Sequence, residues 1–221
     1  MSIAENIQSL RNKITKDVTV IAVSKTRTIE EMQVAYDCGF RDFAESKVQE
    51  LTLKQENFHK DVRWHFIGHL QRNKVKYIAG KVFLIHSLDS IRLLKEIEKQ
   101  YEKLNLTANV LIEINIGREE SKSGILVEEL GELIKEVGNC NYVKVMGIMT
   151  VLPKGDEKSN REYFRQVKEI FDKLDAQKPK NVVMQYLSMG MTGDFIEAIE
   201  EGSNMIRIGE GIFGKRNYNK Q

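Results

Sequence analysis

The sequence predicts an α/β fold, a single closed (β/α)8 TIM barrel. Short apolar runs alternate with charged amphipathic segments along the chain, as expected for βαβ units that build a parallel sheet. Eight such runs occur within 221 residues, which suits an eight-stranded barrel. A doubly wound open sheet is the alternative, but no GxGxxG motif follows the first run to support it.

The expected strands are short and are bounded by polar residues or glycine. The first, VTVIAV, is apolar and mostly β-branched, as a strand buried on both faces requires. The second, RDFAES, has the weakest strand pattern, and we predict a strand there mainly because the neighbouring segments require one. The expected strands are 18–23, 41–46, 63–68, 82–87, 109–116, 142–149, 182–188 and 205–209.

Helical patterns separate these strands. Between Ile91 and Leu104, apolar residues recur every three or four positions and leave the charged residues on the opposite face. The spacing from Thr28 to Glu31 is that of a capping box, which predicts a helix start there. The expected helices are 28–38, 46–58, 70–79, 90–104, 124–137, 158–176 and a shorter one near 194–201.

The sequence also predicts an extra helix before the first strand. The segment SIAENIQSLRNKI (2–14) places its isoleucines and leucine on one face, and Ser2 to Glu5 has capping-box spacing. About a dozen residues follow the eighth run, too few for a full eighth helix. Because the first and last strands are neighbours in a closed barrel, we expect the extra helix to cover the gap.

The composition predicts one soluble domain over residues 1–221. Lys+Arg 34 against Asp+Glu 32 is too even a balance to indicate a nucleic-acid or membrane-surface protein. No run approaches the length of a membrane span, and the first residues lack the apolar core of a signal peptide. Cys38 and Cys140 form no CxxC pattern, which favours a reducing cytoplasm.

Two glycine-containing loops follow the seventh and eighth expected strands, where barrels of this kind often bind phosphate. In SMGMTGD (188–194), hydroxyls and exposed backbone N–H groups precede a helix start, which suits an anion. In GEGIFG (209–214), glycines allow close approach of the backbone. Ordinary turns are the alternative for either loop alone. The coincidence of both loops favours a phosphate site.

Lys25 and Arg207 lie at the ends of the first and last expected strands. The guanidinium of Arg207 offers only donors; its alternative role is an ion pair with Glu210 or Glu113. We expect desolvation and Arg207 to lower the pKa of Lys25, and a neutral amine can form a Schiff base with a carbonyl. The alternative for Lys25 is an ordinary surface lysine. An amine, a cationic donor and a phosphate cradle together suit a phosphorylated aldehyde such as pyridoxal 5′-phosphate (PLP).

These motifs resemble the pyridoxal phosphate homeostasis protein family, whose single-domain barrel is of the alanine-racemase N-terminal-domain type (PLP fold type III). The resemblance covers nearly the whole chain, and its motifs occur in the family's order. The matching segments are IAVSKT (21–26), WHFIGHLQRNK (64–74), INIGREESKSG (114–124), GIMT (147–150), LSMGMTGDFIEAIEEGS (187–203) and RIGEGIFG (207–214).

The resemblance implies a role for each candidate residue. Lys25 would hold PLP as a Schiff base, and Arg207 would meet the cofactor's ring nitrogen. A permanently protonated Arg207 would leave that nitrogen unprotonated, which disfavours carbanion chemistry. The implied protein is not an enzyme: it has no catalytic residues, and it buffers PLP and delivers it to apo PLP-dependent enzymes. The residues implied to hold the phosphate are Ser188, Gly190, Thr192 and Gly209.

The sequence departs from the family pattern at four positions. Ala44 and Ser46 replace a glycine and an asparagine in FAES, and His69 replaces a proline in GHLQ. Glu210 stands where a threonine often follows the phosphate-loop glycine, and a carboxylate there repels phosphate unless it points away. These departures bear on how tightly PLP is held.

Several other functions are compatible with parts of the sequence. A PLP-dependent racemase of low activity is the main alternative, although only Lys25 is identified as a proton donor. A Schiff-base aldolase would need an acid/base partner for Lys25. The basic run RNKVKYIAGK (72–81) is interpreted as a solvated helix face rather than an RNA site. His65 and His69 are four residues apart, but the glycine between them and the expected strand at 63–68 exclude a shared helix face, so we expect no metal and interpret His65 as a satisfied strand-end histidine. We expect a monomer.

Overall fold

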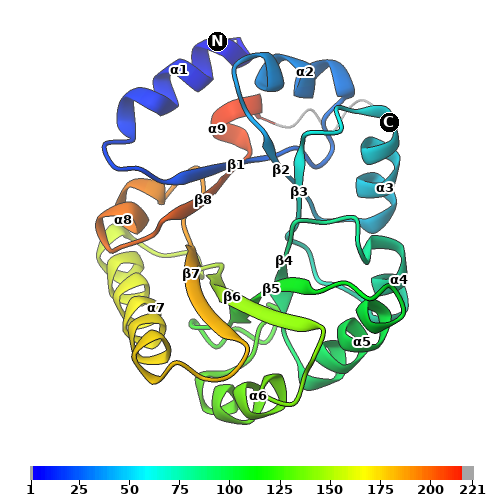
Figure 1. Ribbon diagram of the computed structural model, residues 1–221. Helices are drawn as coiled ribbons and strands as arrows, with labels where there is room; N and C mark the ends of the chain where they lie inside the picture. Colours follow the sequence, from blue (N-terminus) through cyan, green and yellow to red (C-terminus); the bar gives the residue numbers. More distant parts are fainter. Residues whose placement is uncertain (1, 216–221) are drawn as a thin grey trace.

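The computed structural model describes residues 2–215, which form a ring of parallel strands surrounded by helices (Figure 1). The strands pair in chain order and the last pairs with the first, so the sheet is a closed barrel. Every predicted run overlaps a strand, including the weak one at 41–46. The strands are β1 (Thr19–Val23), β2 (Asp42–Glu45), β3 (Arg63–Phe66), β4 (Leu84–Leu88), β5 (Ala108–Ile114), β6 (Val143–Thr150), β7 (Val182–Ser188) and β8 (Met205–Ile208).

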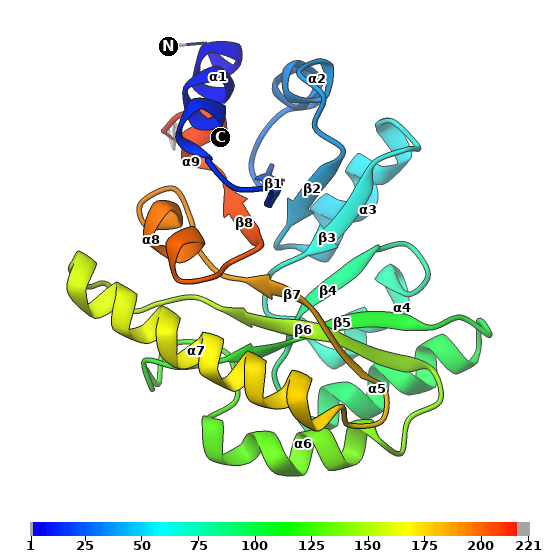
Figure 2. The same ribbon diagram turned by 60° about the vertical axis from the view of Figure 1, so that its left-hand side comes forward.

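The helices cover the outside of this ring (Figures 1 and 2). Among residues 2–215, no helix is both long enough and apolar enough to cross a membrane. The α-helices are α1 (Ile3–Lys13), α2 (Ile29–Asp37), α3 (Val48–Asn57), α4 (Val75–Ile78), α5 (Ile91–Glu102), α6 (Leu130–Val137), α7 (Glu157–Gln177), α8 (Phe195–Glu200) and α9 (Glu210–Phe213), and the 3-10 helices are η1 (Arg72–Lys74) and η2 (Val127–Glu129).

Two predicted helices are shorter than expected. In place of a helix over 70–79, the chain forms η1 and the single turn α4, which ends before Gly80 at φ +71°. The helix predicted from 124 begins only at Leu130, after η2. Its first residues are held by the sheet instead, because Ile125 forms a parallel bridge with Ile114. A local apolar period does not reveal such a tertiary pairing.

Alternation along the strands divides the buried side chains into two clusters. Ile21, Ala44 and Met205 belong to the cluster that fills the barrel interior. Their strand neighbours Ala22 and Phe43 belong to the larger cluster between the strands and the helices. Since side chains alternate with a period of two, this division fixes which residues of each strand face the interior.

The extra helix α1 packs beside α9, next to the neighbouring strands β1 and β8 (Figures 1 and 2). Both hydrogen bonds of the Ser2–Glu5 capping box are present. Ile7 and Leu10 are buried, and Asn6 Nδ2 donates to the backbone oxygen of Ile212 at 3.1 Å. The expectation that this helix compensates for the short last helix is therefore confirmed.

We predict that Ile7→Ala lowers the free energy of unfolding by about 2–5 kcal/mol, because Ile7 is 1% exposed and its removal leaves a cavity under α1. Urea unfolding followed by circular dichroism measures the change. The matched control is Gln8→Ala on the exposed face of the same helix, where we expect a change within about 0.5 kcal/mol. Equal effects of the two substitutions would show that α1 does not stabilise the barrel closure.

Candidate functional site

The residues predicted on the last two strands lie together at the end of the barrel where the strands finish, which we call the C-terminal mouth. Ser188 ends β7, and a guanidinium N–H of Arg207 in β8 donates to its hydroxyl. The backbone N–H of Arg207 donates to Gly190 at 3.0 Å. The two loops are joined as well, because the Gly211 N–H donates to Thr192 Oγ1 at 3.1 Å. The structure thus brings the two predicted phosphate loops into contact.

Lys25 lies on the neighbouring strand end. Pairing of β1 with β8 sets Ile21 opposite Arg207, and Lys25 follows shortly after β1. Side chains of a strand alternate between its two faces, and Ile21 and Val23 face the barrel interior. Continued for one more step, this alternation places Lys25 on the same face. The residue is partly buried. Closure of the barrel therefore brings an amine from the start of the chain beside the site formed near its end.

Backbone geometry requires a glycine in the loop after β7 and places the loop after β8 against β1. Gly190 has φ +98°, and a Cβ added to it would lie 2.6 Å from the Cβ of Ala198, so glycine is required. A Cβ on Gly209 would lie 3.5 Å from Val23, which places this loop against the end of β1. Five loop amides find no hydrogen-bond acceptor within residues 2–215 and remain available to an anion: those of Gly190, Thr192, Gly193, Gly209 and Glu210.

Arg207 is held by neutral oxygens rather than by a carboxylate. Nη1 donates to Ser188 O at 2.8 Å and Ser188 Oγ at 2.7 Å, and Nη2 donates to Thr150 O at 2.8 Å. Two of its five N–H donors therefore have no acceptor within residues 2–215. Within the same range Arg207 forms no ion pair with Glu113 or Glu210, because its partners are Ser188 and Thr150; Glu113 acts on it only through its charge, and Glu210 is exposed.

The charge of Arg207 survives its burial. Desolvation lowers the pKa of the guanidinium to about 10, and Glu113 partly opposes that shift. The side chain therefore stays cationic at neutral pH and can donate hydrogen bonds but not accept them. A ligand that meets it has to supply an acceptor or a negative charge.

A buried polar cluster lies behind Lys25, between the strands and α3. The ammonium of Lys54 donates to Ser24 O at 2.7 Å, to Glu45 Oε1 at 2.9 Å and to Glu50 Oε1 at 2.7 Å. Ser24 Oγ donates to the same Glu45 oxygen at 2.7 Å. Burial raises the pKa of the Glu45 carboxyl, and the Lys54 ammonium opposes that shift. These contacts fix the backbone immediately before Lys25.

The turn that carries Lys25 is strained. The Arg27 N–H donates to Ser24 O at 2.9 Å, which closes a tight turn with Lys25 and Thr26 at its centre. Thr26 has φ +66°, a left-handed conformation that is unfavourable for a β-branched residue. The carboxylate of Glu50 accepts the Thr26 N–H at 2.6 Å and holds this conformation. Neither the strain nor the cluster that supports it can be predicted from the sequence.

Glu113 is a buried carboxyl group near the C-terminal mouth. It is 8% exposed, and its Oε2 has no hydrogen-bond partner among the described residues. Burial raises the pKa of the carboxyl to about 7, the Asp89 carboxylate adds to the shift, and Arg207 opposes it. Glu113 therefore titrates near neutral pH and is largely protonated at mildly acidic pH.

Three of the departures from the family pattern lie around the ends of β2 and β3. Ala44 is buried in the barrel interior. A Cβ on Gly68 would lie 2.2 Å from the backbone oxygen of Ser46, so these two segments are in close contact. His69 Nδ1 lies 2.9 Å from Asp89 Oδ2, which attaches the loop after β3 to the loop after β4.

Two histidines that sequence reasoning left without a role lie in the barrel interior. His65 Nδ1 is 3.0 Å from His86 Nε2, and His86 Nδ1 is 3.2 Å from Ser188 Oγ. At its other nitrogen, His65 is 3.0 Å from Asp42 Oδ1. The expectation that His65 is a satisfied strand histidine is confirmed. The alternation of β3 and β4 indicates that both rings face inward, but not that they meet.

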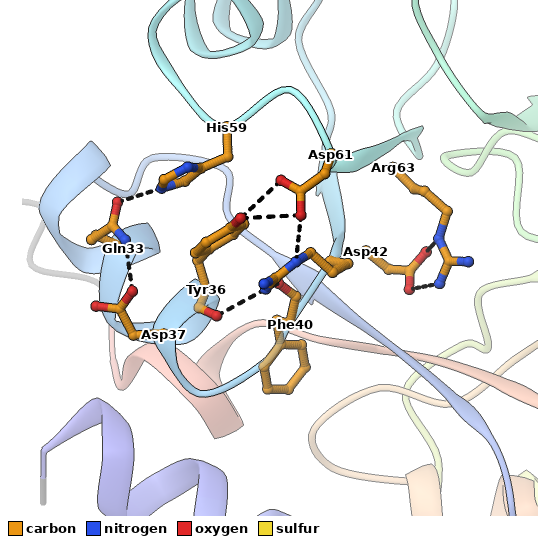
Figure 3. A network of polar contacts seen from close by, with 9 residues as sticks. Gln33, Tyr36, Asp37, Phe40, Asp42, His59, Asp61 and Arg63 are labelled. Atoms are coloured by element: carbon orange, nitrogen blue, oxygen red, sulfur yellow. Dashed lines mark hydrogen bonds and ion pairs between the residues drawn. The ribbon is translucent and has the colours of Figure 1, made fainter.

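Asp42 lies where the strands begin, which we call the N-terminal mouth. Arg63 Nε donates to Asp42 Oδ1 at 2.8 Å, and Figure 3 shows this pair. Close by, Arg41 lies over the ring of Tyr36, 3.7 Å from its centre, and donates to Asp61 at 2.7 Å. These groups lie at the opposite end of the barrel from the candidate site.

The described residues contain no group of three or more histidine, cysteine or acidic side chains arranged to hold a metal ion. His65 is occupied by Asp42 and His86, and His69 by Asp89. The donors at the C-terminal mouth instead fit an anionic organic ligand: loop amides for a phosphate and the open N–H groups of Arg207 for a ring acceptor.

We predict that Glu113 contributes a fall in stability as pH rises from 4.5 to 7, because the folded protein holds a proton there that the unfolded chain has released. Glu113→Gln abolishes this contribution, which is worth up to about 3 kcal/mol. The free energy of unfolding of the variant therefore increases relative to that of the wild type as pH rises. Urea unfolding between pH 4.5 and 8 measures it. Glu132→Gln, on an exposed residue, is the control. Parallel curves for Glu113→Gln and the wild type would contradict the prediction.

Comparison with known proteins assigns the chain to a family. The alanine racemase N-terminal domain family matches residues 1–217. A pyridoxal phosphate homeostasis protein of Aquifex aeolicus is 45% identical over 201 residues, which cover 90% of this chain and 87% of that protein. The protein of the same name from Escherichia coli is 36% identical over 234 residues and covers 99% of both chains.

Solved structures give the same result. PipY of Synechococcus elongatus, solved without PLP, has a TM-score of 0.90 at 30% identity and covers 96% of this chain and 100% of its own. PipY solved with PLP bound has a TM-score of 0.87. An alanine racemase of Clostridium difficile shares the fold at 16% identity, with a TM-score of 0.79, covering 99% of this chain and 61% of its own. The sequence, the barrel and these likenesses agree: the chain belongs to the pyridoxal phosphate homeostasis protein family.

Proposed function

We propose that this protein binds PLP at the C-terminal mouth, holds it as a Schiff base on Lys25, and buffers and delivers it with little or no catalytic turnover. The observation that carries this function is Arg207: a buried cation with two open N–H donors, between two glycine loops and beside the strand end that bears Lys25. The solved relative with bound PLP and the family assignment support it.

The donors divide between two parts of the ligand. In this proposal the loop amides, with Gly190, Thr192 and Gly209, hold the phosphate, and the open N–H groups of Arg207 meet the ring nitrogen; the contact between the two loops and the unused donors of Arg207 support this division. The hydroxyl of Ser188 is buried and bonded to Arg207, so Ser188 acts in the site through that guanidinium. The exposed side chain of Glu210 is free to turn away from a phosphate.

PLP supplies an aldehyde whose carbon accepts the amine of Lys25. The N–C bond forms, water leaves, and a C=N double bond remains; water or another amine reverses the step. Reversibility is what a carrier needs, because an apo PLP-dependent enzyme withdraws the aldehyde by exchanging its own lysine. We place this exchange in the cytoplasm, in keeping with the free thiols of Cys38 and Cys140.

We propose little turnover because Arg207 keeps the ring nitrogen of PLP unprotonated. The guanidinium is a donor that stays charged at neutral pH, so the ring cannot draw electrons as a protonated pyridine does. The main alternative is a racemase of low activity, which needs an acid/base group on each face of the substrate. We further propose that residues 1–221 act as one domain and as a monomer, without nucleic acid or membrane.

We predict that borohydride reduction of the protein with PLP leaves a pyridoxyl-phosphate adduct mainly on Lys25. Peptide mass mapping locates it. The adduct should disappear in Lys25→Ala and remain in Lys47→Ala, whose lysine is exposed near the same mouth. Adducts spread over surface lysines, with no preference for Lys25, would show that this residue is not the site of attachment.

We also predict that the PLP-loaded protein does not accelerate exchange of the α-proton of L-alanine in deuterated water beyond the rate with free PLP. Proton NMR measures the exchange. If the protein accelerates the exchange and Lys25→Ala abolishes the acceleration, the racemase alternative is correct and the carrier function without turnover is wrong.

A further inference from the structure

A continuous chain of hydrogen bonds crosses the barrel interior from one mouth to the other. It begins at Arg207 and passes through Ser188, His86 and His65 to Asp42. The four successive distances are 2.7, 3.2, 3.0 and 3.0 Å. Except for Asp42 at 8% and Arg207 at 4% exposure, its members are fully buried. Branched aliphatic residues normally fill such a barrel, so a polar chain here calls for an explanation.

The donors and acceptors of this chain have one consistent direction. Arg207 only donates, so Ser188 Oγ is an acceptor at that contact, and its own O–H is left to donate to His86 Nδ1. His86 then carries its proton on Nε2, which donates to His65 Nδ1. His65 in turn carries its proton on Nε2, which donates to the Asp42 carboxylate. Both imidazoles are therefore neutral Nε2–H tautomers.

This direction suits the charges at the two ends. Each group turns its negative end toward the Arg207 cation and its positive end toward the Asp42 carboxylate, so the dipoles are aligned and reinforce one another. A proton added to His65 would go to Nδ1 and would set N–H against N–H at the contact between the imidazoles. A proton added to His86 would go to Nδ1 and would face the O–H of Ser188. Burial, together with His65 and Arg207, lowers the pKa of His86, and burial lowers that of His65 against the opposing effect of Asp42.

The chain also ends firmly at the N-terminal mouth. Both carboxylate oxygens of Asp42 accept from Arg63, through Nε at 2.8 Å and Nη2 at 2.5 Å (Figure 3). Arg63 is itself half exposed. The fixed carboxylate orients the ring of His65, and His65 in turn orients the ring of His86. The Ser188 hydroxyl then has a single acceptor, His86 Nδ1. Ser188 Oγ is then fixed as an acceptor for Arg207.

We propose that His65 and His86 are positioning residues for Arg207: with Ser188 and Asp42 they form a one-way chain of neutral hydrogen bonds that fixes the guanidinium from behind and aims its open N–H groups at the ligand ring. The role in ligand binding rests on the proposed function, whereas the direction of the chain follows from the contacts themselves. No carboxylate has to pair with Arg207, so its full charge remains available to the ligand.

The direction of the chain is tested by NMR on the protein labelled with nitrogen-15 in histidine. Long-range nitrogen–proton correlations distinguish the two neutral tautomers and the protonated ring. We expect both His65 and His86 to be neutral Nε2–H tautomers between pH 6 and 8. A proton on Nδ1 of His86, or a protonated ring at either position in this range, overturns the proposal. This test requires no ligand, so its result does not depend on the proposed function.

The positioning role is tested by comparing PLP with 1-deazapyridoxal 5′-phosphate, in which C–H replaces the ring nitrogen. We expect His86→Phe and His65→Phe to weaken equilibrium binding of PLP by about tenfold, the effect of about one well-placed hydrogen bond to a charged group. Binding of the deaza analogue, which has no ring acceptor for Arg207, should change less than about twofold. The matched control is His59→Phe, on a histidine stacked against Tyr36 at the surface.

Equal weakening of both ligands would show a merely structural role for the histidines and overturn the proposal, as would no weakening of PLP. If the phenylalanine variants fail to fold, Asp42→Asn is used in the same comparison, together with the NMR measurement on the wild type. Failure of the wild type to form the Lys25 adduct would reject the proposed function, and the tautomers would still decide the direction of the chain.

Discussion

The parallel pairing of β1 with β8 is the constraint on which the rest of the structure depends. Thr19 to Ala22 pair with Met205 to Ile208, and this contact turns a sheet with two open edges into a closed ring. Once the ring is closed, all strands finish at one mouth and every second residue faces inward. Lys25 and Arg207, from opposite ends of the chain, thereby come to neighbouring strand ends. The packing of α1 beside α9 protects this same closure.

The parts of the molecule that follow from local pattern could be predicted from the sequence. Apolar runs located all of the strands, and glycine loops after the seventh and eighth runs located the candidate phosphate cradle. Arg207 and Lys25 were identified because charged residues at the ends of buried strands are unusual. The lengths of the helices at 75–78 and 130–137 were predicted too long. An amphipathic pattern does not show where a tertiary contact, such as the one between Ile114 and Ile125, prevents the helix from forming.

The buried polar groups could not be predicted, because each depends on which strands meet. His86 and Ser188 are 102 residues apart, and only the closed ring brings their side chains together. Lys54 follows Glu50 by one helical turn, the spacing of an ordinary surface ion pair, yet it lies buried against β2 and the end of β1. Thr26 looks like any loop threonine in the sequence. Its left-handed conformation appears only with the carboxylate that holds it.

Polar side chains occupy part of the barrel interior, and this has a consequence for mapping function by mutation. The N-terminal mouth of such barrels is usually read as a region that affects stability alone. Here a chain of hydrogen bonds connects Arg63 and Asp42 at that mouth to Arg207 at the opposite mouth. A saturation mutagenesis map of this protein should therefore show two separate clusters of sensitive surface positions, one at each end of the barrel axis, joined by a narrow line of intolerant interior sites.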